Sequence, residues 1–276
     1  MRAPTRAAIL IAIYAITCLV ISHYERRITF QPDPRPVTPA ESGLKGVAST
    51  TLRTPDGQTL VVWRTSAKPG RPTILYFHGN GDTLAYRAER IRQFQAEGYG
   101  VFMPAWRGYS GSTGTPSEPA LVADAGLAYD TLRRDGIPAS DIVIYGESLG
   151  TNIAVQTAVT HEARALILEA PFTSMVAAWR QFVPFLPVDM MLSDRFDSLS
   201  IMGRLRMPLL ILHGVRDRIV GQNLGRRLFA AAPDPKRFVS FPEAGHTDLY
   251  DHGAIKSVRK FLDDVAAHRP LEPRKP

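Results

Sequence analysis

The chain has 276 residues, enough for one or two domains and for a core that needs no covalent cross-links. Apolar residues make up 45% and charged residues 21%, the ordinary mixture of a globular protein, so wholesale disorder is excluded. The single cysteine, Cys18, excludes an internal disulfide framework and any zinc finger built on cysteines.

The net charge is +7, and most of the basic residues are arginines. The preferred explanation is a coding bias towards arginine, and the alternative is a surface that binds anionic headgroups. The arginines are dispersed rather than gathered in one block, and no zinc-finger spacing or RNA-binding aromatic motif occurs. Nucleic acid is therefore not an expected partner.

Residues 1–28 are expected to form an N-terminal membrane anchor. An uncharged run extends from Ala7 to Tyr24, close to the shortest helix that crosses a bilayer. A cleaved signal peptide is the rival interpretation, but no small-x-small cleavage site follows the run. A buried core helix is the third interpretation, but core helices are seldom wholly apolar and flanked by arginines.

The orientation of this anchor depends on its flanking charges. Arg2 and Arg6 precede the apolar run, and Arg26 and Arg27 follow it, so the two sides nearly balance. The terminal amine adds a further positive charge on the first side. We therefore expect the N-terminus inside and the rest of the chain outside the cytoplasm, held by a single-pass anchor.

Residues 29–47 are expected to form a proline-rich linker, because four prolines fall within residues 31–43 and stiffen an extended chain. Residues 48–269 are expected to form one domain, and residues 270–276 a frayed tail.

Within this domain, short apolar runs alternate with longer stretches of helical periodicity. The predicted strands are Ser49–Thr54, Thr59–Thr65, Thr73–Phe77, Gly100–Met103, Ile142–Tyr145, Ala165–Leu168, Leu209–Leu212 and Arg237–Phe241. The predicted helices are Thr83–Glu97, Glu118–Arg134, Leu149–Thr160, Gly221–Ala231 and His252–Ala267. This alternation predicts a mostly parallel sheet with helices on both faces and a ligand site at the carboxyl ends of its strands.

The pentapeptide Gly146-Glu-Ser-Leu-Gly150 lies between a predicted strand and a predicted helix. In that context G-x-S-x-G is typical of a nucleophile elbow, a turn so tight that larger residues at the glycine positions would collide. The helix N-terminus beside it stabilises negative charge. Ser148 is therefore the candidate nucleophile.

A glycine-rich turn, His78-Gly-Asn-Gly81, ends the predicted strand Thr73–Phe77. By itself it would be an ordinary turn. Together with the elbow, it is expected to supply a main-chain N–H to the oxyanion that forms when an acyl carbon becomes tetrahedral. The expected donors are the main-chain N–H groups of Asn80 and Leu149.

A serine hydroxyl needs a base, and the base needs a carboxylate that orients it. His246 follows the last predicted strand and is the candidate base, whereas a structural role is expected for the other histidines after Ser148: His161, His213, His252 and His268. Asp217 follows the preceding strand and is the candidate acid. Its alternatives are Asp194, Asp197, Asp248 and Asp251, and a surface salt bridge is the non-catalytic interpretation of Asp217.

Residues 173–207 are expected to form a short lid that two prolines break into pieces. Its apolar side chains are expected both to pack on the core and to cover an acyl pocket. They are Met175, Trp179, Phe182, Val183, Phe185, Leu186, Met190, Met191 and Leu192. The arginines at 180, 195, 204 and 206 are expected to be solvated, with contact to a carboxylate or phosphate as the alternative.

These motifs resemble α/β-hydrolases of the serine-hydrolase group that includes the bud-emergence-type proteins and the membrane-associated protein depalmitoylases. The shared stretches are Phe77-His-Gly-Asn-Gly81, Trp106-Arg-Gly-Tyr-Ser-Gly-Ser-Thr-Gly-Thr-Pro-Ser-Glu118, Tyr145-Gly-Glu-Ser-Leu-Gly150, Glu169-Ala-Pro-Phe-Thr-Ser174, His213-Gly-Val-Arg-Asp217 and Gly245-His246. Two features depart from the group. Trp106 stands where tyrosine is common, and the cysteine-rich N-terminal segment of the depalmitoylases is missing, which weakens a transfer of their activity.

The resemblance implies the α/β-hydrolase fold, a catalytic triad of Ser148, Asp217 and His246, and hydrolysis of an ester, thioester or amide. We expect a membrane-anchored serine hydrolase that acts on a small-molecule or acylated substrate through an acyl-enzyme, with no metal or organic cofactor. The alternative from another class is an inactive α/β-hydrolase scaffold that binds a lipid or a protein partner.

Overall fold

The computed structural model describes residues 3–271 of the chain. Its centre is one eight-stranded sheet in the order β1-β2-β4-β3-β5-β6-β7-β8. The strands are β1 (Ala48–Arg53), β2 (Thr59–Thr65), β3 (Thr73–Phe77), β4 (Gly100–Pro104), β5 (Ile142–Glu147), β6 (Ala165–Glu169), β7 (Leu209–Gly214) and β8 (Lys236–Phe241). Strands β3 to β8 pair in parallel, and the β1–β2 and β2–β4 pairs are antiparallel. The expected mostly parallel sheet is confirmed.

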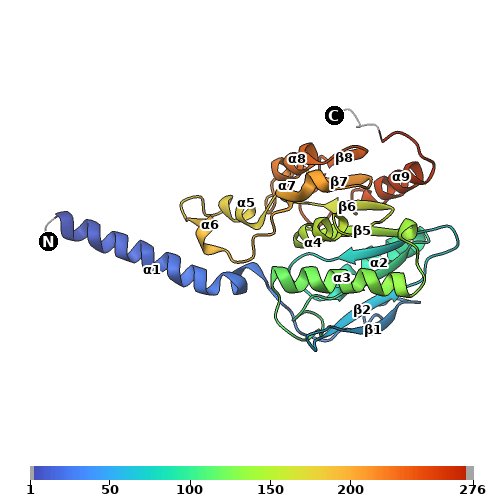
Figure 1. Cartoon of the computed structure of the whole chain (residues 1–276), viewed down its shortest axis with the longest axis horizontal. Coiled ribbons are helices and arrows are strands. Elements are labelled where there is room, and N and C mark those ends of the chain that lie inside the picture. Colours follow the sequence, from blue (N-terminus) through green and yellow to red (C-terminus); the bar gives the residue numbers. More distant parts are fainter. Residues whose placement is uncertain (1–2, 272–276) are drawn as a thin grey trace.

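Helices lie on both faces of this sheet (Figure 1). They are α2 (Ala88–Ala96), α3 (Glu118–Arg134), α4 (Leu149–Ala158), α8 (Gln222–Ala231) and α9 (Ala254–Ala266). Helices α3 and α4 pack together over β3, β5 and β6, while an ion pair joins α9 to the end of α2 on the other side. Because both faces are covered, strands β3 to β7 are buried along their whole length and read as apolar runs.

Helix α1 (Ala3–Thr29) projects from this domain (Figure 1, blue). Its segment Arg6–Thr29 has a mean hydropathy of 2.0, and none of its most apolar window is buried inside the protein. A long apolar helix that does not pack into the protein core is typical of a membrane span or a signal sequence. Arg2, one of the flanking charges considered above, lies outside the described residues.

The segment after α1, within the proline-rich linker expected for residues 29–47, lies against the domain. Phe30 and Leu44 are buried in the main core, and the Phe30 ring packs edge-on against Phe196. The main-chain N–H of Ser110 donates to the carbonyl of Asp33 at 2.7 Å, so the extended chain is bound along the domain surface. Two apolar side chains, Phe30 and Leu44, therefore attach this segment to the core.

The expected lid, residues 173–207, consists of short pieces. They are α5 (Met175–Arg180), α6 (Val188–Met191), α7 (Ser198–Ile201) and the 3-10 helix η3 (Met202–Arg204), with irregular connections between α5 and α6 and between α6 and α7. Leu186, Val188 and Met191 are buried, whereas Phe182 and Phe185 are exposed, so the segment both packs on the core and presents apolar surface. Of the expected tail, residues 272–276 lie outside the described residues.

Candidate active site

Ser148 lies in the turn between β5 and α4, and its backbone is strained. Its φ of 49° and ψ of −115° fall in a region that residues other than glycine rarely adopt. A Cβ at Gly146 would lie 2.5 Å from the carbonyl oxygen of Gly150, and one at Gly150 would lie 2.0 Å from that of Phe77. Only glycine fits at these two positions, and this close packing holds the serine at the end of the sheet.

His246 and Asp217 complete a chain of hydrogen bonds that begins at Ser148. The Nε2 atom of His246 lies 2.9 Å from Ser148 Oγ, and its Nδ1 atom lies 2.8 Å from Asp217 Oδ2. The three residues follow β5, β7 and β8, whose carboxyl ends share one sheet edge. The structure thus brings together the three residues that the sequence analysis selected.

Asp217 is held by its own loop as well as by His246. Its Oδ1 atom accepts the main-chain N–H groups of Ile219 at 2.9 Å and Val220 at 2.8 Å. Burial alone would raise the pKa of Asp217, but the hydrogen bonds from His213 and His246 outweigh it and hold that pKa well below its ordinary value. Asp217 therefore remains a carboxylate whenever His246 needs a negative partner.

His213 lies directly behind Asp217, and the sequence analysis gave it only a structural role. Its Nε2 atom lies 2.9 Å from the carbonyl oxygen of Val220 and 3.4 Å from Asp217 Oδ2, and its ring is fully buried. Gly225 on α8 makes room for the ring, because a Cβ there would lie 2.5 Å from Nδ1. His213 thus positions the acid. Its place four residues before Asp217, at a buried strand end, was the available signal.

The alternative acids lie elsewhere. Asp194 is buried and accepts Arg26 Nε at 2.8 Å and the Glu118 main-chain N–H at 2.9 Å. Asp197 caps α7, and Asp248 accepts the main-chain N–H of Gly245 at 2.7 Å. The side chain of Asp251 lines a cavity on the far side of the elbow, with Glu147 and Arg90. Of these five carboxylates, only Asp217 contacts His246 in the described part of the chain.

The remaining histidines have other surroundings. His161 Nδ1 lies 3.1 Å from the carbonyl oxygen of Thr157 at the end of α4, and His252 pairs with Asp248 at 3.7 Å. His268 is exposed just after α9.

The turn after β3 faces the elbow. Asn80 and Leu149 line the same cavity as Ser148. Leu149 is the first residue of α4, so its N–H has no acceptor within the helix. Among residues 3–271, the Asn80 main-chain N–H has no acceptor either. Within the described residues, Asn80 and Leu149 thus line the Ser148 cavity with unpaired main-chain N–H groups, and their role as oxyanion donors stays a prediction.

His78 fixes the shape of this turn. Its Nδ1 atom lies 2.7 Å from the carbonyl oxygen of Gly79, and its Nε2 atom accepts the Trp106 main-chain N–H at 3.1 Å. Only the neutral ring with its proton on Nδ1 can make both bonds. Burial, with help from the charge of Arg87, lowers the pKa of His78 to about 3 and keeps the ring neutral.

Trp106, which stands where related proteins commonly have tyrosine, packs against the same turn. Its indole Nε1–H donates to the His78 carbonyl at 3.0 Å, and its ring stacks on Phe77.

A buried network of charges lies beneath the elbow, and the sequence analysis missed it. Arg87 donates to Glu147, the residue before Ser148, and to the carbonyl of Gly81 at 3.1 Å. Arg90 pairs with Glu169 and lies over the ring of Tyr250. Burial acts to raise the pKa of Glu147, but Arg87 and Arg90 hold it well below its ordinary range. One arginine therefore ties the elbow to the turn that carries Asn80.

Ser148 opens into a cavity of about 410 Å³ that is mostly apolar. Its walls come from the lid, from the Asp217 loop and from the end of α1. The lining residues are Ile28, Thr29, Gln31, Asn80, Ser148, Leu149, Phe172, Met175, Ala178, Trp179, Phe182, Val183, Ile219 and Val220. An apolar cavity with a few polar groups at one end is typical of a small-molecule site.

Comparison with known proteins agrees with this geometry. Residues 68–199 match the model of the serine aminopeptidase family S33. An uncharacterized protein of Mycobacterium tuberculosis is 34% identical over 95% of this chain and 96% of its own length. An α/β-hydrolase domain-containing protein of Arabidopsis thaliana, WAV2, is 30% identical over 86% of this chain and 85% of its own. The chain belongs to the α/β-hydrolase family.

Other relatives and solved structures extend this result. The protein bem46 of Schizosaccharomyces pombe is 34% identical to this α/β-hydrolase over 79% of this chain and 77% of its own. An esterase of Pyrococcus furiosus has the same fold, with a TM-score of 0.66, 19% identity, and coverage of 86% of this chain and 98% of that chain. The structural likeness confirms the expected fold class.

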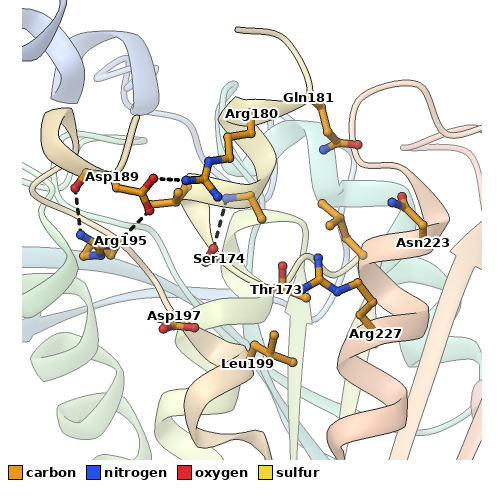
Figure 2. A pocket seen from close by; sticks show the side chains of 13 residues that line it. Thr173, Ser174, Arg180, Gln181, Asp189, Arg195, Asp197, Leu199, Asn223 and Arg227 are labelled. Atoms are coloured by element: carbon orange, nitrogen blue, oxygen red, sulfur yellow. Dashed lines mark hydrogen bonds and ion pairs between the residues drawn. The ribbon is translucent and has the colours of Figure 1, made fainter. Parts of the chain in front are cut away.

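A second cavity, of about 420 Å³, lies on the other side of α5 and is charged (Figure 2). Arg180 and Arg195 both pair with Asp189 there, and Arg227 of α8 points into the same space. Ser148 does not line this cavity. This second cavity is lined by charged side chains that pair with one another, whereas the cavity at Ser148 is mostly apolar.

Proposed function

We propose that the protein is a serine hydrolase that cleaves an ester, thioester or amide through an acyl-enzyme. Ser148 Oγ attacks the carbonyl carbon while His246 Nε2 takes the hydroxyl proton. The main-chain N–H groups of Asn80 and Leu149 stabilise the oxyanion. His246 then returns the proton to the leaving group as its bond to the acyl carbon breaks. Water, deprotonated by His246, releases the acid and restores the serine.

One observation carries this proposal: the unbroken chain from Ser148 Oγ through His246 to Asp217, at 2.9 Å and 2.8 Å. Asp217 holds the His246 tautomer whose Nε2 is free to accept the serine proton. The strained backbone of Ser148 supports the same role, because such strain persists mainly at functional sites.

The substrate class follows from the cavity. Its walls offer apolar side chains from the lid and only a few polar groups near Ser148, which favours an acyl or lipid-like chain over a charged one. The polar end lies at the serine, where the scissile carbonyl would sit. We propose no metal or organic cofactor for this chemistry, since the chain's own residues supply each proton transfer.

Labelling with a fluorophosphonate probe tests the chemistry. The wild-type chain in detergent should be labelled, Ser148→Ala should not, and the exposed-serine control Ser66→Ala should match wild type. Ser148→Ala should also lose hydrolysis of p-nitrophenyl esters by several orders of magnitude. An unlabelled wild-type chain that binds lipid would favour the inactive scaffold instead.

We further propose that α1 is an uncleaved single-pass anchor and that the hydrolase domain lies outside the cytoplasm. The length and hydropathy of Arg6–Thr29 support it, and so does the packing of residues 30–44 on the domain. Removing residues 1–24 should release the protein from membranes in a carbonate wash, while the full chain stays bound. A truncated chain that still pellets with membranes would contradict the anchor, and protease protection of the domain in sealed vesicles tests its side.

A further inference from the structure

The lid runs alongside α1 rather than away from it. Arg26 Nε donates to Asp194 at 2.8 Å, Ser22 Oγ to the carbonyl of Met191 at 3.1 Å, and Tyr14 OH to the carbonyl of Phe185 at 2.8 Å. Tyr14 and Arg26 are separated by about 18 Å along the helix axis, at 1.5 Å per residue. The lid therefore follows α1 from its charged end into its uncharged stretch.

Residues 182–190, here called the lid tip, expose large apolar side chains to an unusual degree. Met190 is 87% exposed, Phe185 71% and Phe182 61%. Outside α1, the described part of the chain has only three other exposed large apolar side chains, and all three are less exposed: Tyr86 at 58%, Ile219 at 54% and Val215 at 52%. Apolar surface concentrated in one short segment marks an interaction site.

The backbone of the lid tip leaves few N–H groups without a partner. Residues 184 and 187 are prolines and have no N–H group. Of the seven N–H groups in the lid tip, five donate to carbonyls within residues 179–187, those of residues 182, 183, 186, 188 and 190, whereas those of Phe185 and Asp189 have no acceptor in the described part of the chain. The Phe185 carbonyl accepts the Tyr14 hydroxyl. Each N–H group that is paired within the segment, or replaced by proline, lowers the cost of entering hydrocarbon, where water offers no alternative partner.

The lid tip also has little charge, and that charge is paired. Residues 181–188 carry no charge. The lid tip contains one charged side chain, Asp189, and it pairs with Arg180 and Arg195 (Figure 2). Pairing lowers the cost of bringing such groups close to lipid.

We propose that the lid tip inserts into the hydrocarbon of the same bilayer that α1 crosses, so that the Ser148 cavity opens to the membrane. The inference rests on the proposed anchor, and continuity with α1 identifies lipid as the partner. Ile28 at the end of α1 and Phe182 and Val183 of the lid tip all line that cavity. An acyl chain therefore enters the site from the lipid phase, with its carbonyl near the level at which α1 leaves the membrane.

A spin label tests the insertion directly in the full chain. Cys18→Ser removes the only cysteine, and a nitroxide is then attached at Phe185→Cys or, as control, at the exposed Ser66→Cys on the opposite sheet edge. In phosphatidylcholine vesicles, the label at 185 should be accessible to oxygen and protected from a water-soluble nickel complex, and the label at 66 the reverse. Equal access of the nickel complex to both labels would overturn the insertion.

Kinetics test the consequence. Phe185 does not line the cavity, so Phe185→Asp should leave hydrolysis of soluble p-nitrophenyl butyrate within about twofold of wild type. The cost of a carboxylate in hydrocarbon should lower kcat/KM for vesicle-borne p-nitrophenyl palmitate by at least about tenfold. Phe185→Leu and the charge-matched control Ser66→Asp should behave like wild type on both substrates.

The outcomes separate the proposals. An inactive wild-type chain whose 185 label is protected would contradict the hydrolase and support the insertion. A chain released by carbonate would contradict the anchor. An active, carbonate-resistant chain in which Phe185→Asp hydrolyses both esters normally would contradict only the role of the lid tip. If Phe185→Asp does not fold, the label at 185 decides.

Discussion

The catalytic edge of the sheet and the lid that covers it are built in opposite ways. At the edge, Ser148, His246 and Asp217 are tied to one another, and buried charges support the strands behind them. The lid has short helices, an apolar surface and three side-chain hydrogen-bond contacts to α1. The difference teaches that the two regions have separate roles in our proposals: the sheet edge holds the triad in place, and the lid and α1 form the path by which substrate enters.

The largest effect should come from the acid. Asp217→Asn keeps the shape of the side chain but can stabilise the wrong His246 tautomer, a change that costs about four orders of magnitude in a serine protease. We expect a similar fall in kcat. Asp194→Asn and Asp248→Asn, measured at the same pH, should change kcat only slightly, since neither contacts His246. If Asp194→Asn lowered kcat more than Asp217→Asn did, the catalytic acid would be Asp194 in the lid.

The next largest effect should come from the buried charges. Arg90→Met leaves Glu169 unpaired in the core and should lower the free energy of unfolding by about 3–5 kcal/mol. The control is Arg92→Met on the same helix, whose ion pair with Glu89 is exposed and should cost less than about 1 kcal/mol. Urea unfolding measures both. Equal losses would show that the network does not support the catalytic edge as described.

The sequence predicted the sheet and Ser148 because both depend on local signals. Buried strands are apolar runs, and the elbow glycines are required by contacts within a few residues of chain. The charge network was missed because Arg87 and Glu147, or Arg90 and Glu169, are far apart in sequence. Glu147 and Glu169, both at the ends of apolar strands, were the available sign that partners had to exist.

The packing of the segment after α1 on the domain was missed for a different reason. Its prolines predict an extended chain, but this prediction does not say whether that chain contacts the domain. Phe30 and Leu44, two apolar residues among polar ones, are the residues that bind it to the core. Their burial could not be read from composition, because it depends on a surface built by distant parts of the chain.

A smaller effect should appear in the pH dependence of stability. The His78 ring stays neutral in the folded protein down to about pH 3, whereas in the unfolded chain it takes up a proton below about pH 6.5. Its contribution is therefore complete above pH 6.5 and is lost as the pH falls, by about 1.4 kcal/mol per unit. The carboxylates of Asp217 and Glu147 act in the same direction but only below about pH 4.5.

Urea unfolding at pH 7.0, 6.0 and 5.0 checks this expectation. His78→Asn, which removes the titrating group, should be less stable at pH 7.0 and should lose less stability than wild type between pH 7.0 and 5.0. Parallel losses in the two proteins would assign the pH dependence to other groups.

The smallest effect should come from the contact between the catalytic edge and the end of α1. Asn80 Nδ2 donates to the Thr29 carbonyl at 2.6 Å, and its Oδ1 accepts the Gln31 N–H at 3.0 Å. Asn80→Ala should cost about 1–2 kcal/mol of stability. It should raise KM for long-chain esters a few-fold, because Thr29 and Gln31 line the cavity.

Gln95→Ala is the matched control. It removes a comparable bond, from Gln95 Nε2 to the carbonyl of Lys45 at 3.0 Å, on the same N-terminal segment but away from the cavity. Its KM should equal that of wild type. A shift in both variants would mean that loosening the segment anywhere alters the site.

Trapping of the acyl group tests the central claim most directly. The full chain in detergent is mixed with p-nitrophenyl butyrate, quenched in acid within milliseconds, digested and measured by mass spectrometry. The account predicts a burst of p-nitrophenol and a butyryl group on the peptide that contains Ser148, absent from Ser148→Ala. Turnover with no acyl group on Ser148, retained in Ser148→Ala, would contradict it.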